Sequence, residues 1–357
     1  MAFHLPPLPV PASVELETPA VLRQVARAHR PLAELKGAAA TIPNEHILID
    51  TLGLQEAKDS SAIENIITTE DDLFRGDTVS GQFPSPASKE VHNYATALKI
   101  GFERVRQQTF LRLDDVLAIQ AALEENRAGL RQLPGTVLKN QQTGAVVYEP
   151  PQDPAEVERL MSNFLEHFHR DEPGDPDPLV RMAVLHYQFE SIHPFYDGNG
   201  RTGRILNLLH LVLHGLLDLP VLYLSRYVVQ HKADYYRGLQ AVRETAAWES
   251  WVLYVLRAVE ETSRDTLTKV RGIRDLMQET KQRLRRDVPK LYSQELLNNL
   301  FRHPYTKIEF IERDLAVSRP TATKYLGALE KAGIVRKTKL GRSNFYINEP
   351  LFTLLSR

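Results

Sequence analysis

The sequence predicts a mainly helical protein with one short β-hairpin inside its helical part and a small mixed α and β unit at its C-terminal end. Two segments with apolar residues at helical spacing, 182–192 and 205–214, flank a glycine-containing loop. Two short runs of strand-forming residues meet at Thr143-Gly144, which is typical of a hairpin. Residues 288–357 read as helices followed by two strands around a glycine turn.

Composition narrows the class of protein. The chain has 357 residues, enough for two or three domains, with 43% hydrophobic residues, 25% charged residues and a net charge of -1. It has no cysteine, which excludes disulfides, a thiol nucleophile and cysteine metal ligands, and is typical of a reducing compartment. The histidines match no compact zinc-ligand spacing. We find no signal peptide and no apolar run of transmembrane length, so we expect a cytoplasmic protein without a membrane partner.

Helical segments are expected along most of the chain. Residues 1–50 begin extended and become helical from about Ala20, and another helix is expected over about 55–72. A loop ends in a helix cap at Ser88, and the chain from Lys89 to about Glu260 is helical apart from the hairpin, the glycine loop and a break at 173–178. A charged helix over 262–287 leads to Val288-Pro289, which marks a domain boundary.

The glycine loop reads His193-Pro-Phe-Tyr-Asp-Gly-Asn-Gly-Arg-Thr-Gly-Arg204. Phe195 is apolar within this polar loop, so we expect it to anchor the loop to the core. Gly198, Asn199 and Gly200 stand at the entrance of the following helix, where free backbone N–H groups and a partial positive charge favour an anion. The loop is therefore a candidate phosphate cradle.

Charged side chains in the same loop suit a polyphosphate. Arg201 and Arg204 lie about one helical turn apart and can point toward one anion with bidentate, permanently charged contacts. Asp197 offers a hard oxygen ligand for Mg²⁺. His193 is the side chain most easily set as a general base near neutral pH. The combination predicts a binding site for a phosphate compound and Mg²⁺ beside a candidate base.

This loop resembles the signature of the Fic family, His-x-Phe-x-Asp/Glu-Gly-Asn-Gly-Arg-x-x-Arg, at every specified position. Members of the family mostly transfer AMP from ATP to a protein hydroxyl. The resemblance implies that His193 deprotonates a Ser, Thr or Tyr of the target, that Asp197 holds Mg²⁺, and that Arg204 holds the γ-phosphate. The remaining ATP-binding residues would be Gly198, Asn199, Gly200, Arg201, Thr202 and Gly203.

A second motif lies upstream. Ser60, Glu64 and Asn65 match the Fic inhibitory pattern Ser/Thr-x-x-x-Glu-Gly/Asn. Read alone, a serine followed by a glutamate also fits a helix cap. With the downstream loop, the resemblance implies that Glu64 pairs with Arg204, blocks the γ-phosphate position and inhibits the enzyme from within the same chain. Some relatives also use this glutamate to remove AMP, so deAMPylation stays open.

The resemblance also implies roles for the hairpin and for a tyrosine further along the chain. Val137 to Tyr148 forms two strands around Thr143-Gly144, and Pro150-Pro151 ends the second because proline cannot donate to a β-ladder. In the family this hairpin is a flap that binds target main chain, here through Thr136, Val137, Leu138 and Lys139; the alternative is an ordinary exposed hairpin. Tyr236 is expected against the adenine, with Tyr235 as the alternate.

The C-terminal unit resembles a winged helix over about 290–348. Helices are expected over 291–301, 306–315 and 317–333, followed by two strands. Residues 288–357 contain twelve Lys and Arg against six Asp and Glu, a charge of +6 that suits DNA phosphates. Winged helices also bind proteins, so the partner stays open. Candidate nucleic-acid contacts are Arg319, Thr321, Lys324, Lys339 and Arg342.

Together these observations divide the chain into an N-terminal region (1–88), a Fic catalytic core (89–261), a linker helix (262–287) and a winged-helix domain (288–357). The function expected is an autoinhibited protein adenylyltransferase that uses ATP and Mg²⁺. The candidate partners are a target protein, its own chain through self-modification, a second copy in a homodimer, and DNA. The alternatives are a nucleotide-sensing, DNA-binding transcription regulator, and a Fic transferase that uses another phosphate donor.

Overall fold

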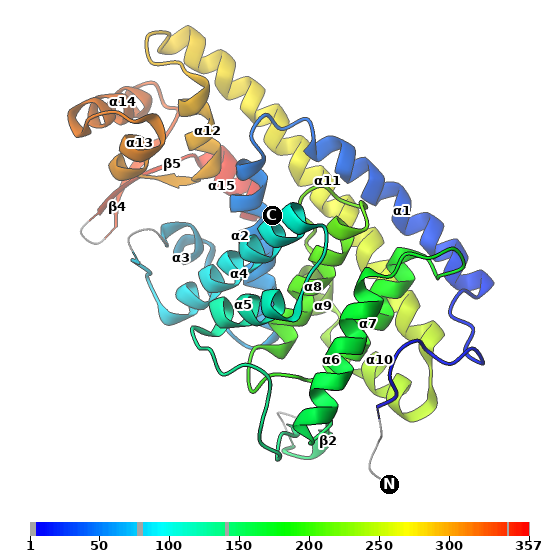
Figure 1. Cartoon of the computed structure of the whole chain (residues 1–357). Coiled ribbons are helices and arrows are strands. Elements are labelled where there is room, and N and C mark those ends of the chain that lie inside the picture. Colours follow the sequence, from blue (N-terminus) through cyan, green and yellow to red (C-terminus); the bar gives the residue numbers. More distant parts are fainter. Residues whose placement is uncertain (1–4, 77–80, 140–142, 341–342, 357) are drawn as a thin grey trace.

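The computed structural model describes residues 5–76, 81–139, 143–340 and 343–356 (Figure 1). The helices preceding the glycine loop are α1 (Pro19–Ala39), α2 (Glu45–Ile63), α3 (Glu70–Arg75), α4 (Pro86–Gln108), α5 (Leu113–Glu124), α6 (Pro154–His169) and α7 (Pro178–Ile192). Those following it are α8 (Asn199–Leu213), α9 (Leu224–Gln230), α10 (Lys232–Thr245), α11 (Trp248–Asp287), α12 (Gln294–Arg302), α13 (Ile308–Leu315), α14 (Arg319–Lys331) and α15 (Glu349–Ser356). The predicted mainly helical class is confirmed.

Helix α7 lies at the centre of the core. Nearly all of its residues are buried, which requires packing partners on every side. It packs against α6, α8 and α11, and α8 also contacts α4 and α5. Because α7 and α8 are adjacent and joined by residues 193–198, the glycine loop is held at one end of a pair of almost fully buried helices.

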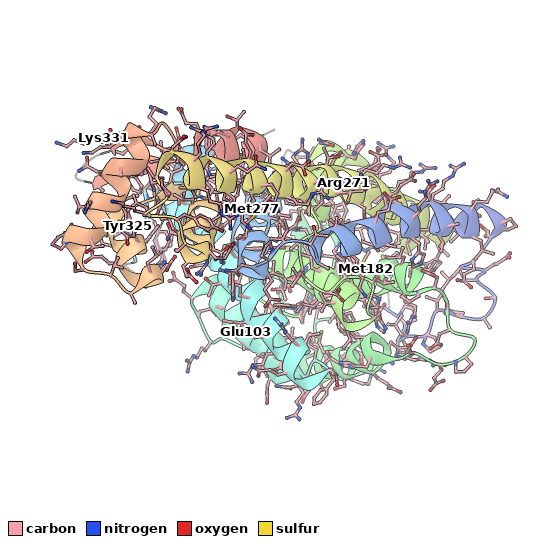
Figure 2. All side chains as sticks on the ribbon, turned by 90° about the horizontal axis from the view of Figure 1, so that it is seen from above. Glu103, Met182, Arg271, Met277, Tyr325 and Lys331 are labelled. Atoms are coloured by element: carbon pink, nitrogen blue, oxygen red, sulfur yellow. The ribbon has the colours of Figure 1, made fainter. Side chains whose placement is uncertain are left out.

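The longest helix joins the core to the C-terminal unit. Helix α11 has 40 residues and runs beside α1 along one edge of the molecule (Figure 2). The helix expected over 262–287 is therefore only the second half of α11, which begins at Trp248, and the linker role expected for that part stays a prediction. Buried side chains continue through that half, including Leu267, Val270 and Ile273, so the apolar stripe never ends at residue 261.

The hairpin consists of β1 (Leu138–Lys139) and β2 (Val146–Tyr148), which pair antiparallel. Leu138 faces Tyr148, and the register shifts at the next pair. Of the predicted 137–148 span, residues 140–142 lie outside the described residues. Figure 1 shows β2 at one end of the molecule, beside the start of α6, which follows it in the chain.

The C-terminal unit has the strand and helix order expected of a winged helix. Its sheet has the order β3-β5-β4, built from β3 (Tyr305–Thr306), β4 (Arg336–Leu340) and β5 (Ser343–Ile347). The unit is attached to α2: Asp50 binds both Lys99 of α4 and Arg302 of α12. Its helices start later than expected because Ser293 caps α12 and Thr306 belongs to β3.

Two further helix bounds differ from the prediction. The helix expected over about 55–72 is two helices, because α2 ends at Ile63 and Asn65 adopts a left-handed backbone with φ 64°. The cap expected at Ser88 is instead Ser85, whose hydroxyl accepts a hydrogen bond from the Ser88 N–H, with Pro86 in the first turn. Among the described residues, no helix combines the length and apolar character needed to cross a membrane.

Candidate active site

The glycine loop is a rigid turn between α7 and α8. His193 and Gly198 both have left-handed backbones, with φ 49° and φ 77°. Asn199 holds the loop closed: its side-chain oxygen accepts from the Phe195 N–H and its amide donates to the Phe195 carbonyl, both at 2.8 Å. Phe195 is fully buried, which agrees with its predicted role as an anchor.

We expect Asn199→Ala to lower the free energy of unfolding by about 2 to 4 kcal/mol, because it leaves a buried N–H and a buried carbonyl of Phe195 unpaired. Urea denaturation followed by circular dichroism measures this change. Asn126→Ala is the control, since Asn126 is exposed. Equal stability of the two variants would contradict the role assigned to Asn199.

The surroundings of His193 favour the neutral form of its imidazole. Its pKa is lowered from 6.5 to about 4, first by burial and next by the nearby positive charge of Arg131, against the opposing effects of the Glu190 carbonyl and the Glu64 charge. The imidazole is therefore unprotonated at neutral pH and able to accept a proton.

Arg204 is held by the upstream motif. Its side chain is only 3% exposed. Its Nε donates to Ser60 Oγ at 2.8 Å, and its Nη2 donates both to the Ser60 carbonyl at 3.0 Å and to Glu64 Oε1 at 2.8 Å. Burial raises the pKa of Glu64, but the charge and hydrogen bond of Arg204 and the charges of Arg201 and Lys232 together outweigh burial, so the net shift is downward. Glu64 is thus an ionised partner that occupies the guanidinium.

Glu64 directly follows the last residue of α2, and a lysine of α10 binds the C-terminal end of that helix. Lys232, the first residue of α10, donates to the Ile63 carbonyl at 2.6 Å and to Asn65 Oδ1 at 3.4 Å. A cation at a helix C-terminus satisfies free carbonyls and the negative end of the helix dipole. Lys232 thereby fixes the position from which Glu64 reaches Arg204, and the sequence motifs did not single it out.

The first motif arginine has acidic partners that the sequence also did not reveal. Arg201 donates to Glu124 Oε1 at 2.7 Å and to Glu90 Oε2 at 3.2 Å. Glu124 is the last residue of α5 and lies 77 positions from Arg201, so no local spacing links them. Burial raises the pKa of Glu124, although the Arg201 charge acts in the opposite direction.

These groups line a cavity of about 570 Å³. Its wall includes Glu64, Glu90, Glu124, Leu138, His193, Tyr196, Asp197 and residues 198–201. The glycines let carboxylates approach the turn: a methyl group added at Gly200 would lie 2.5 Å from Glu64 Oε1, and one at Gly198 would collide with Glu124 Oε1. Two carboxylates therefore sit where the sequence predicts phosphate oxygens.

The other predicted ATP-binding residues divide into two groups. Thr202 and Gly203 are buried, and Gly203 packs against Phe189 and Glu190, so they shape the α7–α8 contact. Tyr236 is 47% exposed. Burial, and next the negative charge of Glu64, raise its pKa to about 12. Tyr235 is only 3% exposed and hydrogen-bonds to His186 at 2.9 Å, so the alternate choice for the adenine contact is a core residue.

Asp197 is exposed at the edge of the cavity, and its Oδ1 accepts from the Gly198 N–H at 2.7 Å. The described residues contain no group of three or more His, Asp or Glu side chains arranged for a metal ion. A magnesium ion bound with a nucleotide commonly takes one protein carboxylate and phosphate oxygens, so a single free carboxylate oxygen at the glycine turn fits such an ion.

The hairpin brings one of its four predicted flap residues, Leu138, to the cavity. Thr136, Val137 and Leu138 are half-buried and Lys139 is exposed, and Leu138 lines the cavity. The Thr136 carbonyl accepts from Gln152 Nε2 at 2.9 Å.

The predicted nucleic-acid contacts lie far from this cavity, on the C-terminal unit. Lys324 and Lys339 are exposed and Thr321 is half-buried. Arg319 is exposed but paired with Glu309 at 2.9 Å and with Glu312 at 3.4 Å, which reduces the positive charge available to a phosphate. Arg342 lies outside the described residues. DNA binding stays a prediction.

Family profiles match three successive parts of the chain. They are described as Fic/DOC family N-terminal (residues 22–103), Fic/DOC family (110–211) and protein adenylyltransferase SoFic-like, C-terminal domain (276–351). The third profile begins within α11, which agrees with the continuity of that helix.

Curated relatives and solved structures agree with these profiles. A protein adenylyltransferase Fic from Culex quinquefasciatus is 28% identical over 160 residues, covering 44% of this chain and 30% of that protein, and protein adenylyltransferase fic-1 of Caenorhabditis elegans is 31% identical over 110 residues, 31% of this chain and 20% of that protein. The matches thus span less than a third of either relative.

The structural neighbours extend over more of the chain. A Fic family protein from Desulfovibrio desulfuricans G20 aligns with a TM-score of 0.58 and 21% identity over 96% of this chain and 98% of its own. Fic-1 (residues 134–508) from C. elegans aligns with a TM-score of 0.54 and 21% identity over 71% of this chain and 73% of its own. With its complete glycine loop and the three matching profiles, the chain belongs to the Fic family.

Proposed function

We propose that this protein transfers AMP from ATP to a hydroxyl group of a target protein and is inhibited by its own Glu64. The observation that carries the proposal is the 2.8 Å ion pair between Glu64 and Arg204, because Glu64 lines the cavity that also contains the neutral base His193 and the glycine turn. The names of the curated relatives, which are protein adenylyltransferases, support the same activity.

The residues divide the work of the reaction. His193 accepts the proton of the target hydroxyl, whose oxygen attacks the α-phosphorus of ATP as pyrophosphate leaves. The N–H groups at the start of α8 and Arg201 bind phosphate oxygens, and this fixed positive environment stabilises the charge that develops. Arg204 takes the γ-phosphate and thereby orients ATP for in-line attack. Asp197 would hold Mg²⁺, which supplies charge neutralisation for the phosphates when bound.

Inhibition follows from competition for one guanidinium. Glu64 and a γ-phosphate both require the face of Arg204 that Glu64 now holds at 2.8 Å. While the ion pair persists, the γ-phosphate lacks its arginine and the α-phosphorus is not aligned with His193. The target main chain would add to the exposed edge of β1, which leaves its side chains largely unread.

The test is the intact mass of the protein after incubation with ATP and Mg²⁺, for wild type, Glu64→Gly and Glu64→Gly/His193→Ala. We expect a gain of one AMP in Glu64→Gly that disappears in the double variant. If self-modification is absent, transfer of labelled AMP to proteins of a cell lysate is measured with the same three variants. Absence of transfer from ATP in both assays would reject the proposal.

The low pKa of His193 predicts a flat pH profile. Its folded pKa of about 4 lies below the ordinary 6.5, so protonation of the base begins only well below neutral pH. We expect the transfer rate of Glu64→Gly to change less than about twofold between about pH 7.5 and about pH 5.5, where an ordinary histidine would lose about tenfold. The rate per folded molecule is measured, with folding followed by circular dichroism.

The folding check is needed because the same shift affects stability. A histidine with a lowered folded pKa favours the unfolded state once pH falls below 6.5, and the loss of stability grows until the folded pKa is reached. An acid limb centred near pH 6.5 in molecules that remain folded would contradict the burial of His193.

A further inference from the structure

Four consecutive carbonyls around the candidate base are bound by residues that flank the flap. The Ser191 carbonyl accepts from the Tyr148 hydroxyl at 2.8 Å. The guanidinium of Arg131 donates to the Ile192 carbonyl at 3.2 Å and to the His193 carbonyl at 2.7 Å. The backbone N–H of Arg131 donates to the Pro194 carbonyl at 2.9 Å. Tyr148 ends β2 and Arg131 precedes β1, so both ends of the flap hold the backbone of His193.

These contacts satisfy backbone carbonyls at the C-terminal end of α7. Helix α7 ends at Ile192, and the carbonyls of a last helical turn have no partner within the helix. The negative end of the helix dipole favours a cation there. His193 itself adopts φ 49°, a backbone conformation that is uncommon for a residue other than glycine and persists only when neighbours fix it.

Arg131 is an unusual choice for a structural cation. Its side chain is only 1% exposed, and within the part of the chain that the structure describes it takes part in no ion pair with a carboxylate. Its other contact is to the Pro151 carbonyl at 2.8 Å, just beyond β2. Burying a charge against carbonyls alone is costly, so simple stability gives little reason for an arginine at this position.

A second link ties the same segment to the catalytic loop. The hydroxyl of Tyr196 accepts from the Gln132 N–H at 2.9 Å and from the Leu133 N–H at 3.2 Å. The irregular segment that leads into β1 is thus joined to the backbone on both sides of His193.

We propose that Arg131 is a positioning residue that ties the two ends of the flap to the backbone of His193, so that binding of the target main chain to the flap and orientation of the base are one event. The inference rests on the proposed function, in which the flap binds the target and His193 accepts its proton. It assigns a role to a side chain that touches neither nucleotide nor target.

Arg131 has a second effect on the same residue. Its positive charge is the second cause, after burial, of the lowered pKa of His193. One guanidinium therefore fixes the place of the imidazole and helps to keep it unprotonated.

The experiment uses the full chain with Glu64→Gly and adds Arg131→Lys or Arg131→Met, with Arg127→Met as the matched control because Arg127 is exposed on the same segment. Lysine keeps the charge but cannot span the carbonyls of residues 151 and 193 together. Methionine removes both charge and hydrogen bonds. Rates of AMP transfer to protein are measured against ATP concentration, and His193 is titrated by NMR, its signal identified from His193→Ala.

We expect Arg131→Lys to lower kcat at least about tenfold with little change in the KM for ATP, which is the effect of a misplaced base. The pKa of His193 should stay low in Arg131→Lys and rise in Arg131→Met. Arg127→Met should match its parent. A purely structural arginine would change the melting temperature but leave the rate per folded molecule and the histidine titration unaltered.

The outcomes distinguish failure of the proposed function from failure of the positioning role of Arg131. Absence of AMP transfer in Glu64→Gly itself would reject the proposed function, and the NMR titration would still test the link between Arg131 and His193. Transfer by Glu64→Gly together with an unchanged kcat in folded Arg131→Lys would overturn the positioning role. If Arg131→Met does not fold, kcat and the His193 titration measured on Arg131→Lys, which keeps the charge, still test the positioning role.

Discussion

Replacing Glu64 by glycine should raise the rate of AMP transfer about 10- to 100-fold, because it frees Arg204 for one charged hydrogen-bonded contact with the γ-phosphate, worth about 1.5 to 3 kcal/mol. The ion pair that this substitution removes joins a guanidinium that is almost fully buried to a carboxylate whose pKa is lowered by it. The rate is measured by intact mass, with ATP and Mg²⁺ at saturating concentration.

Two further variants distinguish the effect of losing one negative charge from the effect of losing the contact between Glu64 and Arg204. Glu64→Gln keeps the shape of the side chain but loses the ion pair, so it should also activate, to a smaller extent. Glu103→Gln makes the same change of net charge on the exposed face of α4 and should leave the rate unchanged (Figure 2). Equal rates for Glu64→Gly and wild type on the same target would refute inhibition by Glu64.

Replacing His193 by alanine in the activated Glu64→Gly protein should lower the transfer rate by about 10²- to 10⁴-fold, the usual contribution of a positioned general base. The loop itself should survive, since the reciprocal bonds between Asn199 and Phe195 do not involve the imidazole. Nucleotide binding should therefore persist, and this is measured by calorimetry with a non-hydrolysable ATP analogue.

The control for this substitution is His46→Ala, since His46 is exposed at the start of α2. It should transfer AMP at the rate of the Glu64→Gly parent. Loss of transfer together with loss of nucleotide binding in His193→Ala would assign the histidine to the nucleotide pocket and would count against its role as the base.

The glycine loop could be predicted from the sequence because all of its parts are contiguous. His193, Asn199 and Arg204 lie within twelve positions, and two helices with clear periodicity fix the ends of the loop. Glu64 could be added because its motif is short and local. The structure brings Glu64 to Arg204 across 140 positions, and only the resemblance to a family linked the two motifs beforehand.

The supporting residues could not be predicted in the same way. Arg131, Glu124 and Lys232 reach the site from segments that look like ordinary polar loops and helix ends. A buried arginine that binds carbonyls has no sequence pattern that separates it from an exposed one. The end of α2 was missed for a related reason: Asn65 tolerates both helical and left-handed backbones, and the choice depends on Lys232 and Arg204, which are distant in sequence.

The pairing of α1 with α11 has a consequence for how the molecule is assembled. These two helices, Pro19–Ala39 and Trp248–Asp287, form one of the main contacts of the protein although more than half of the chain lies between them. Contacts of such sequence separation form slowly, since a long loop must close first. During synthesis, which proceeds from the N-terminus, α1 emerges long before its partner. The apolar face of α1 therefore stays uncovered until α11 has left the ribosome, and nascent chains are at that stage the form most exposed to aggregation and to chaperones.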